Sequence, residues 1–124
     1  MEPKMKTLVL TSLFVLSVIF TGTILAQTQI QSGKFSANKS VEGYTLDQNV
    51  GDRSMTIDVT FVKPFDKKPS ITLSVIMIDA ETKSNIRYNV EASSISRDGF
   101  TIKISTWSDT KILGIAGNWM AYAE

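Results

Sequence analysis

Apolar and polar residues alternate along most of the chain beyond residue 27. The clearest run is residues 54–61, in which every second side chain is apolar and the intervening ones are Thr56, Asp58 and Thr60. Alternation with a period of two over four to eight residues is typical of a β-strand that buries one face. We therefore expect the apolar members of this run to face a hydrophobic core: Met55, Ile57, Val59 and Phe61.

Similar alternation recurs in residues 71–78, 87–95, 100–105 and 115–121, and "IQSGKFS" at 30–36 predicts a further strand. In the first of these runs Ile71, Leu73, Val75 and Met77 are expected on the core face, with Ile76 and Ile78 on the other. The remaining core faces are expected to hold Tyr88, Val90 and Ala92, then Phe100, Ile102 and Ile104, then Ile115, Gly117, Trp119 and Ala121. The segments "NVGDRS", "KPFDKKPS" and "SRDG" between the runs have turn chemistry. No segment has a helical period, so the sequence predicts an all-β, six-stranded antiparallel β-sandwich.

The first 26 residues have a different pattern. Lys4 and Lys6 precede an almost unbroken apolar run over residues 8–20, and Ala26 offers a small residue for cleavage. This arrangement predicts a secretory signal peptide at 1–26 and a secreted, extracellular domain at 27–124. A retained signal anchor is the alternative, because residues 7–26 nearly reach the length of a membrane span. Serine, threonine and glycine dilute that stretch and favour cleavage, after which we expect no insertion into a membrane.

The composition argues against several classes of function. The chain contains no histidine and no cysteine, which removes serine and cysteine triads and the usual zinc sites. The carboxylates show neither a pairing suited to acid–base catalysis nor the ligand spacing of a calcium loop; those considered are Asp47, Asp52, Asp79, Glu81 and Asp109. We therefore expect no enzyme activity, no metal and no cofactor.

The charge of the chain is balanced. The formal net charge is +1, and removal of residues 1–26 brings it to about zero. No block of basic residues is present to bind nucleic acid, so no nucleic-acid partner is expected. A cysteine-free secreted domain of this size buries little surface on its own and gains from association with further copies. The sequence therefore indicates a homo-oligomer.

Two residues suggest recognition of a sugar. Trp107, in "STWSDTKI" at 105–112, stands at the end of an alternating strand where the chain turns into water. An aromatic ring at the lip of a sheet suits the apolar face of a pyranose, and Arg87 can offer a bidentate fork to its hydroxyls. A Trp107 that plugs the core, and an Arg87 that is an ordinary surface charge, are the alternatives. Separately, Asn38-Lys-Ser40 forms a sequon that makes Asn38 a candidate glycosylation site.

Residues 30–124 resemble the H-type lectins, the domain of snail agglutinins and of the C-terminal part of discoidins. The resemblance runs in order through "IQSGKF", "VTFVKPFDKKPSITLSVIMID", "NIRYNVEASSISRDGF", "STWSDTKI" and "GNWMAYAE", and only residues 37–53 are hard to place. It implies a six-stranded sandwich that assembles as a trimer. It also implies metal-independent binding of galactose and N-acetylgalactosamine in a shallow pocket between neighbouring subunits.

The resemblance also implies roles for individual residues. Arg87 matches the sugar-binding arginine and Trp107 the tryptophan that walls the pocket. Ser108 stands where snail members have a sugar-binding histidine, and because serine is shorter and cannot stack, affinity or preference is expected to differ. Leu113 stands where they have a second aromatic wall, so the apolar contact is expected to be weaker. The acidic ligand comes from "DQNVGDR", in which Asp52, next to Gly51, is preferred to Asp47.

The sequence thus predicts a secreted, metal-independent lectin for terminal galactose or N-acetylgalactosamine. It would cross-link glycans multivalently, in recognition or defence against foreign surfaces. The alternative is a structural or adhesion module that keeps the trimer, has a degraded sugar site and binds protein partners. Ser108 and Leu113 favour that alternative.

Overall fold

The computed structural model describes residues 27–124. The expected signal peptide at 1–26 lies outside the described residues. Six strands make up the fold: β1 (Gln29–Asn38), β2 (Arg53–Thr60), β3 (Ser70–Ala80), β4 (Asn89–Ser93), β5 (Gly99–Thr106) and β6 (Ile112–Ala123). No helix occurs in this part of the chain, and hence none that could cross a membrane. The predicted all-β, six-stranded antiparallel sandwich is confirmed.

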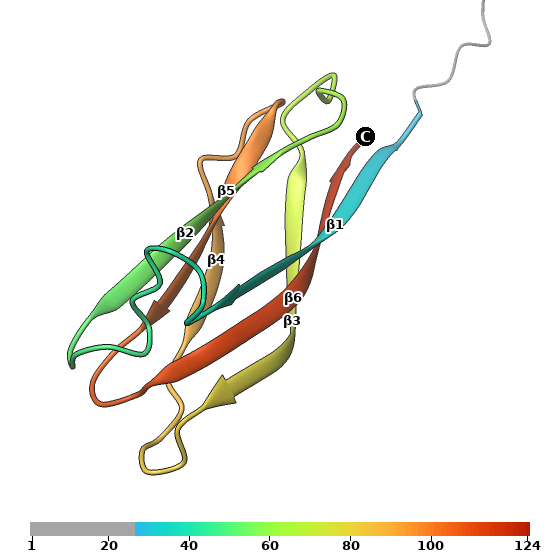
Figure 1. Cartoon of the computed structure of the whole chain (residues 1–124). Helices are drawn as coiled ribbons and strands as arrows, with labels where there is room; N and C mark the ends of the chain where they lie inside the picture. The colour runs from blue at the N-terminus through green and yellow to red at the C-terminus, as the bar shows by residue number, and fades with distance from the viewer. Residues whose placement is uncertain (1–26) are drawn as a thin grey trace, which may run out of the picture.

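The strands form two three-stranded sheets, in the orders β1-β6-β3 and β2-β5-β4 (Figure 1). All neighbouring strands are antiparallel. The strand orders make β6 the central strand of one sheet and β5 that of the other. The connections 39–52, 81–88 and 107–111 gather at one end of the sandwich, and 61–69 and 94–98 lie at the other (Figure 1). Gln29 pairs with Ala123, so β1 begins beside the point where β6 ends.

The core lies between the two sheets and follows the predicted alternation. Phe100, Ile102 and Ile104 of β5 are buried, and the core-facing side chains of β2 pack against them. Aromatic rings fill the end of the core nearest the 61–69 connection, where Phe61 meets Phe65 at 4.8 Å between ring centroids. Phe100 and Trp119 meet edge-on at 5.4 Å. Each such ring stabilises the fold by about 1.5–3 kcal/mol through burial alone.

One part of the predicted alternation is wrong. A register shift between Val75 and Met77 marks a bulge in β3 opposite β6. The extra residue reverses the faces beyond it. Met77, expected in the core, is therefore 45% exposed, while Ile78 packs against the core. The fourth strand is also shorter than predicted, so Tyr88 lies exposed before β4 instead of on a core face.

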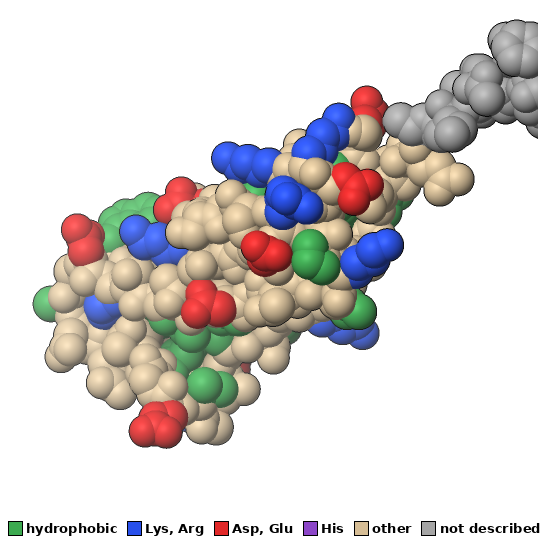
Figure 2. Space-filling model, turned by 90° about the horizontal axis from the view of Figure 1, so that it is seen from above, with side chains coloured by type: hydrophobic (Ala, Val, Ile, Leu, Met, Phe, Trp, Pro, Cys, Tyr) green, Lys and Arg blue, Asp and Glu red, His purple; other side chains and the backbone are tan. Residues whose placement is uncertain are grey.

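Charged side chains of both signs are interspersed over the face in Figure 2. This view looks down on the molecule from above the orientation of Figure 1. Acidic groups lie among the basic ones on this side, with exposed apolar side chains between them. This distribution lacks the single-sign field that attracts a polyanion.

Gly117 provides the space in which β3 bulges against β6. It pairs with Val75, and a Cβ at this position would lie 2.1 Å from the Ser74 carbonyl oxygen and 2.5 Å from the Phe35 ring. Gly117→Ala is therefore expected to lower the free energy of unfolding by about 2 kcal/mol or more, because backbone and ring must both move. Urea titration of both proteins measures the difference.

Gly114→Ala is the matched control on the same strand. A Cβ there would have its nearest neighbours at 3.6–3.8 Å, which is ordinary contact. We expect Gly114→Ala to change stability by less than about 0.5 kcal/mol. Equal losses in the two variants would show that close packing at Gly117 is not what couples the two strands.

Candidate functional site

Trp107 begins the turn that joins the two sheets at the end of β5. Thr106 before it points inward and is buried, so the next side chain points to the outer face. Trp107 is 41% exposed and takes no part in the core cluster. Within the described chain it is a surface aromatic at the lip of a sheet and does not plug the core.

The pairing of the strands places three candidate residues at the same level. Arg53 pairs with Thr106 on one side of β5, and Asn89 pairs with Ser105 on the other. The Gly51 N–H donates to the Ser108 carbonyl at 2.9 Å, which continues the first register past the strand end and sets Asp52 opposite Trp107. Two residues before Asn89, the second register reaches Arg87, whose carbonyl accepts a 2.6 Å bond from the Thr106 hydroxyl.

A hollow of about 310 Å³ lies beside the indole ring on the outer face of the β2-β5-β4 sheet. We call it the Trp107 hollow, and it is lined by Asp52, Arg53, Ser54, Lys103, Ser105, Thr106 and Trp107. Its volume is at the small end of the range for ligand sites. Hydroxyls, one carboxylate and one aromatic face are the groups that a saccharide uses, since it presents polar edges and an apolar ring face.

The backbone around the hollow turns sharply. Gly51 and Ser108, which bond to each other, both have positive φ, at 86° and 59°. Gly51 adopts this conformation without strain, whereas Ser108 is a non-glycine residue in the left-handed region. The Ser108 carbonyl is thereby committed to Gly51 and Arg53, while its side chain is exposed.

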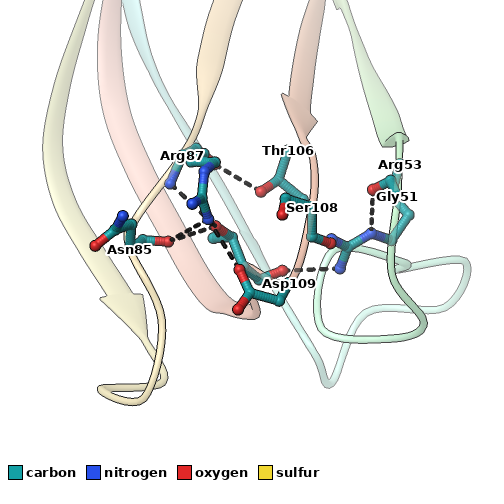
Figure 3. Close-up of polar contacts among 8 residues, drawn as sticks. Gly51, Arg53, Asn85, Arg87, Thr106, Ser108 and Asp109 are labelled. Atoms are coloured by element: carbon teal, nitrogen blue, oxygen red, sulfur yellow. Dashed lines mark hydrogen bonds and ion pairs between the residues drawn. The ribbon is translucent and has the colours of Figure 1, made fainter.

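Arg87 lies on the other side of the same turn (Figure 3). Its Nη1 donates to Asp109 Oδ1 at 2.9 Å and, more weakly, to the Asn85 carbonyl and the Thr110 hydroxyl, each at 3.3 Å. Its Nε and Nη2 have no hydrogen-bond partner among residues 27–124. The guanidinium is thus held by one nitrogen, and its other two nitrogens make no hydrogen bond within the described chain. Arg87 does not itself line the Trp107 hollow.

A second arginine, Arg53, holds the turn from inside and was missed by the sequence analysis. Its side chain is 9% exposed and donates to five carbonyl oxygens. They belong to Gly51 at 3.0 Å, Leu46 at 3.4 Å, Gln48 at 3.0 Å, Thr110 at 2.8 Å and Ser108 at 2.9 Å. Arg53 therefore joins the connection before β2 to the turn after β5, with Ser108 lying between the two arginines (Figure 3).

Tyr44 anchors the middle of the 39–52 connection. Its buried hydroxyl donates to the Ile112 carbonyl at 2.6 Å. Burial, together with the charges of Asp47 and Asp79, raises the pKa of Tyr44 to about 12. Asp47 has a buried Oδ1 without a hydrogen-bond partner in the described part of the chain. Of the two acidic candidates, Asp52 lines the Trp107 hollow and Asp47 does not.

The remaining candidates lie elsewhere. Leu113 is half-buried in β6, which belongs to the other sheet, and it does not line the hollow of its own chain. Asn38 ends β1, and its Oδ1 accepts a 2.9 Å bond from the Ser40 N–H. Glycosylation at this exposed asparagine stays a prediction. Residues 27–124 contain no group of three or more His, Cys, Asp or Glu side chains placed to hold a metal ion.

A family model described as the H-type lectin domain matches residues 56–122, which is more than half of the chain. The chain belongs to this family. The match spans the strands β3, β4 and β5 entirely, and with them Arg87, Trp107 and Ser108.

Comparison with known proteins gave one relative and two solved structures of interest. A protein of Fuscovulum blasticum described as "ATP synthase subunits region ORF 7" is 38% identical over 71 residues, which is 57% of this chain and 62% of that protein. The wild-type discoidin II of Dictyostelium discoideum has a TM-score of 0.70 at 20% identity over 79% of this chain and 37% of that one. A native structure of the recombinant discoidin II gives 0.69 at 20% identity over 81% and 38%. This H-type lectin domain therefore shares the discoidin fold and spans less than two thirds of each of these proteins.

Replacing Arg53 tests whether it holds the site together. Arg53→Lys keeps the charge but has too few donors to reach five carbonyls. We expect the free energy of unfolding to fall by about 2–4 kcal/mol, because carbonyls desolvated around a charged donor lose their partner. Hydrogen exchange at the Gly51 amide, which bonds Ser108, should accelerate in parallel.

Arg97→Lys is the control for this change. Arg97 makes one such contact, from Nε to the Phe65 carbonyl at 2.8 Å. Its replacement should cost about 1 kcal/mol or less and leave exchange at Gly51 unchanged. Similar losses in both variants would show that the Arg53 network does not stabilise the turn.

Tyr44 predicts a dependence of stability on alkaline pH. Because the folded state raises the pKa of Tyr44 from 10 to about 12, its contribution is complete below pH 10 and is lost as the pH rises through 12. The loss is on the order of 2 kcal/mol. The difference in unfolding free energy between wild type and Tyr44→Phe should therefore shrink across this range, measured by urea titration at several pH values. A constant difference would contradict the assignment.

Proposed function

We propose that this H-type lectin domain binds terminal galactose or N-acetylgalactosamine beside Trp107, between Arg87 and the adjoining end of the Trp107 hollow, without a metal ion. One observation carries the proposal: the strand registers set Asp52, Trp107 and Arg87 side by side at one end of the β2-β5-β4 sheet. A carboxylate, an indole face and a guanidinium supply, in that order, an acceptor for paired hydroxyls, an apolar wall and a donor.

The partial engagement of Arg87 supports its role. Asp109 holds Nη1, and this contact fixes the side chain, while Nε and Nη2 remain available for hydroxyl oxygens. A guanidinium already ordered in the free protein loses less entropy when it binds a ligand. Gly51 and Ser108 do not line the hollow, and they contribute through the backbone hydrogen bond that keeps Asp52 opposite Trp107.

The proposal includes a secreted homotrimer with its sites between subunits. The open hollow of the single chain leaves one side of a sugar uncovered, and a neighbouring subunit would close it. Leu113 could contribute only in this way, because it lies in the other sheet of its own chain. Several weak sites on one trimer would strengthen binding to a cell surface by a factor on the order of 10²–10⁴. Such multivalency suits glycan cross-linking in recognition or defence.

A structural or adhesion module that binds protein partners is the second candidate. It is favoured by exposed apolar side chains around the β3 and β4 edges: Ile76, Met77, Ile86 and Tyr88. Leu113 in place of an aromatic wall and Ser108 in place of histidine also favour it. The same side chains could instead serve contacts between copies of this chain, so glycan binding itself decides between the two candidates.

Arg87→Ala tests the proposal directly. Loss of charge-assisted hydrogen bonds worth about 1.5–3 kcal/mol should weaken binding to N-acetylgalactosamine roughly tenfold to a hundredfold. Calorimetric titration of wild type and variant, with and without EDTA, measures the change. Wild-type affinity should be the same in EDTA, since no metal is invoked.

The control is Arg97→Ala, which removes an arginine at the opposite end of the sandwich and should leave affinity unchanged. Light scattering on each protein establishes that the oligomeric state is the same. Unaltered binding in Arg87→Ala would show that the site is elsewhere. A folded wild-type protein that binds no glycan would favour the adhesion module.

A further inference from the structure

The Trp107 hollow extends beyond the proposed sugar-binding residues, and Lys103 lines the end of it that is remote from Trp107. Lys103 lies in β5, four residues before Trp107. This spacing corresponds to about 14 Å along an extended strand, which is longer than one pyranose ring. Ser105 lies between them on the same outer face, with Ser54 opposite on β2. The hollow therefore has room along the sheet for a second sugar next to the terminal one.

The charge of Lys103 is not neutralised by an ion pair within residues 27–124. Glu91 is its partner in register on β4, and Thr56 is its partner on β2. The ion pair within residues 27–124 joins Arg87 to Asp109. The carboxylate of Glu91 therefore lies more than 4 Å from the Lys103 amine. The hollow opens on the β2 side of Lys103, away from Glu91, and the lysine is half-buried along its wall.

The two ends of the hollow thus differ in charge. Asp52 lies with Trp107 at one end and Lys103 at the other, with serine hydroxyls between them. The arginine in the lining, Arg53, has its donors occupied by five carbonyls and is not free to bind an anion. Lys103 is consequently the cation available to a ligand that extends along the sheet.

We propose that the Lys103 end is a subsite for an acidic sugar, so that the preferred ligand is a galactose or N-acetylgalactosamine joined to a uronic acid or a sulfated residue. This inference rests on the proposed function, because the terminal sugar at Trp107 brings the second sugar to Lys103. Lys103 then selects among glycans that share the same terminal residue, and Glu91 opposes that selection by like-charge repulsion.

Two disaccharides that differ in a single group test the inference. N-acetylgalactosamine joined to glucuronic acid carries a carboxylate where N-acetylgalactosamine joined to glucose carries a hydroxymethyl group. The measured quantity is the ratio of their affinities, determined by calorimetry at low ionic strength. Wild type should bind the acidic disaccharide about two- to fivefold more tightly, the range of an exposed ion pair, and the ratio should fall as salt is added.

Three variants assign the ratio to its cause. Lys103→Met, which keeps an unbranched apolar stem, should bring the ratio to about one, and Lys103→Arg should preserve it. Glu91→Gln should raise the ratio, because it removes the repulsion. If Lys103 had only a structural role, its replacement would change both affinities together and leave their ratio unchanged. Glu91→Gln would then not raise the ratio.

The outcomes separate this inference from the function on which it rests. If wild type binds the neutral disaccharide and the ratio of the two affinities is one, the acidic subsite is overturned and the lectin function stays intact. A ratio retained in Lys103→Met, or lowered in Glu91→Gln, would also overturn it. A folded protein that binds neither disaccharide would overturn both proposals.

Discussion

The site depends on the hydrogen bonds from the buried guanidinium of Arg53 to five backbone carbonyls. Moving a cation out of water is costly unless hydrogen bonds replace its hydration. Here that replacement comes from backbone carbonyls, and no carboxylate of the described chain lies within ion-pair distance. Each of those carbonyls belongs to a segment outside regular strands, so one side chain sets the positions of two connections at once. Asp52 and Trp107 lie in those connections, and their relative placement follows from this network.

The inward–outward alternation of the strands also predicts the orientation of Arg53 and Trp107, which the sequence analysis did not use. Arg53 continues the inward series of Met55 and Ile57, and it is buried although arginine is usually a surface residue. Trp107 continues the outward series of Lys103 and Ser105, and it is exposed although tryptophan is usually buried. In both cases backbone geometry overrode the preference of the side chain. Extending the parity by two residues would have found both.

Other features could not be read from the sequence. The β3 bulge depends on how Val75 and Met77 meet a partner strand some forty residues later, and no local pattern marks it. The Arg87–Asp109 pair and the bonds from Arg53 to the Ser108 and Thr110 carbonyls likewise join segments that are distant in the chain. The strands themselves were predictable, because alternation is a local consequence of one-sided burial. The connections depend on tertiary contacts, and these carry the candidate site.

The pairing of Gln29 with Ala123 has a consequence for attachment. Both ends of the described chain lie at the end of the sandwich that is remote from the 39–52 and 107–111 connections (Figure 1). Anything joined to either end would therefore leave from the side opposite the Trp107 hollow. Fused to a second domain, or immobilised through a tag, the protein would display its hollow outward to the solution and keep it clear of the support.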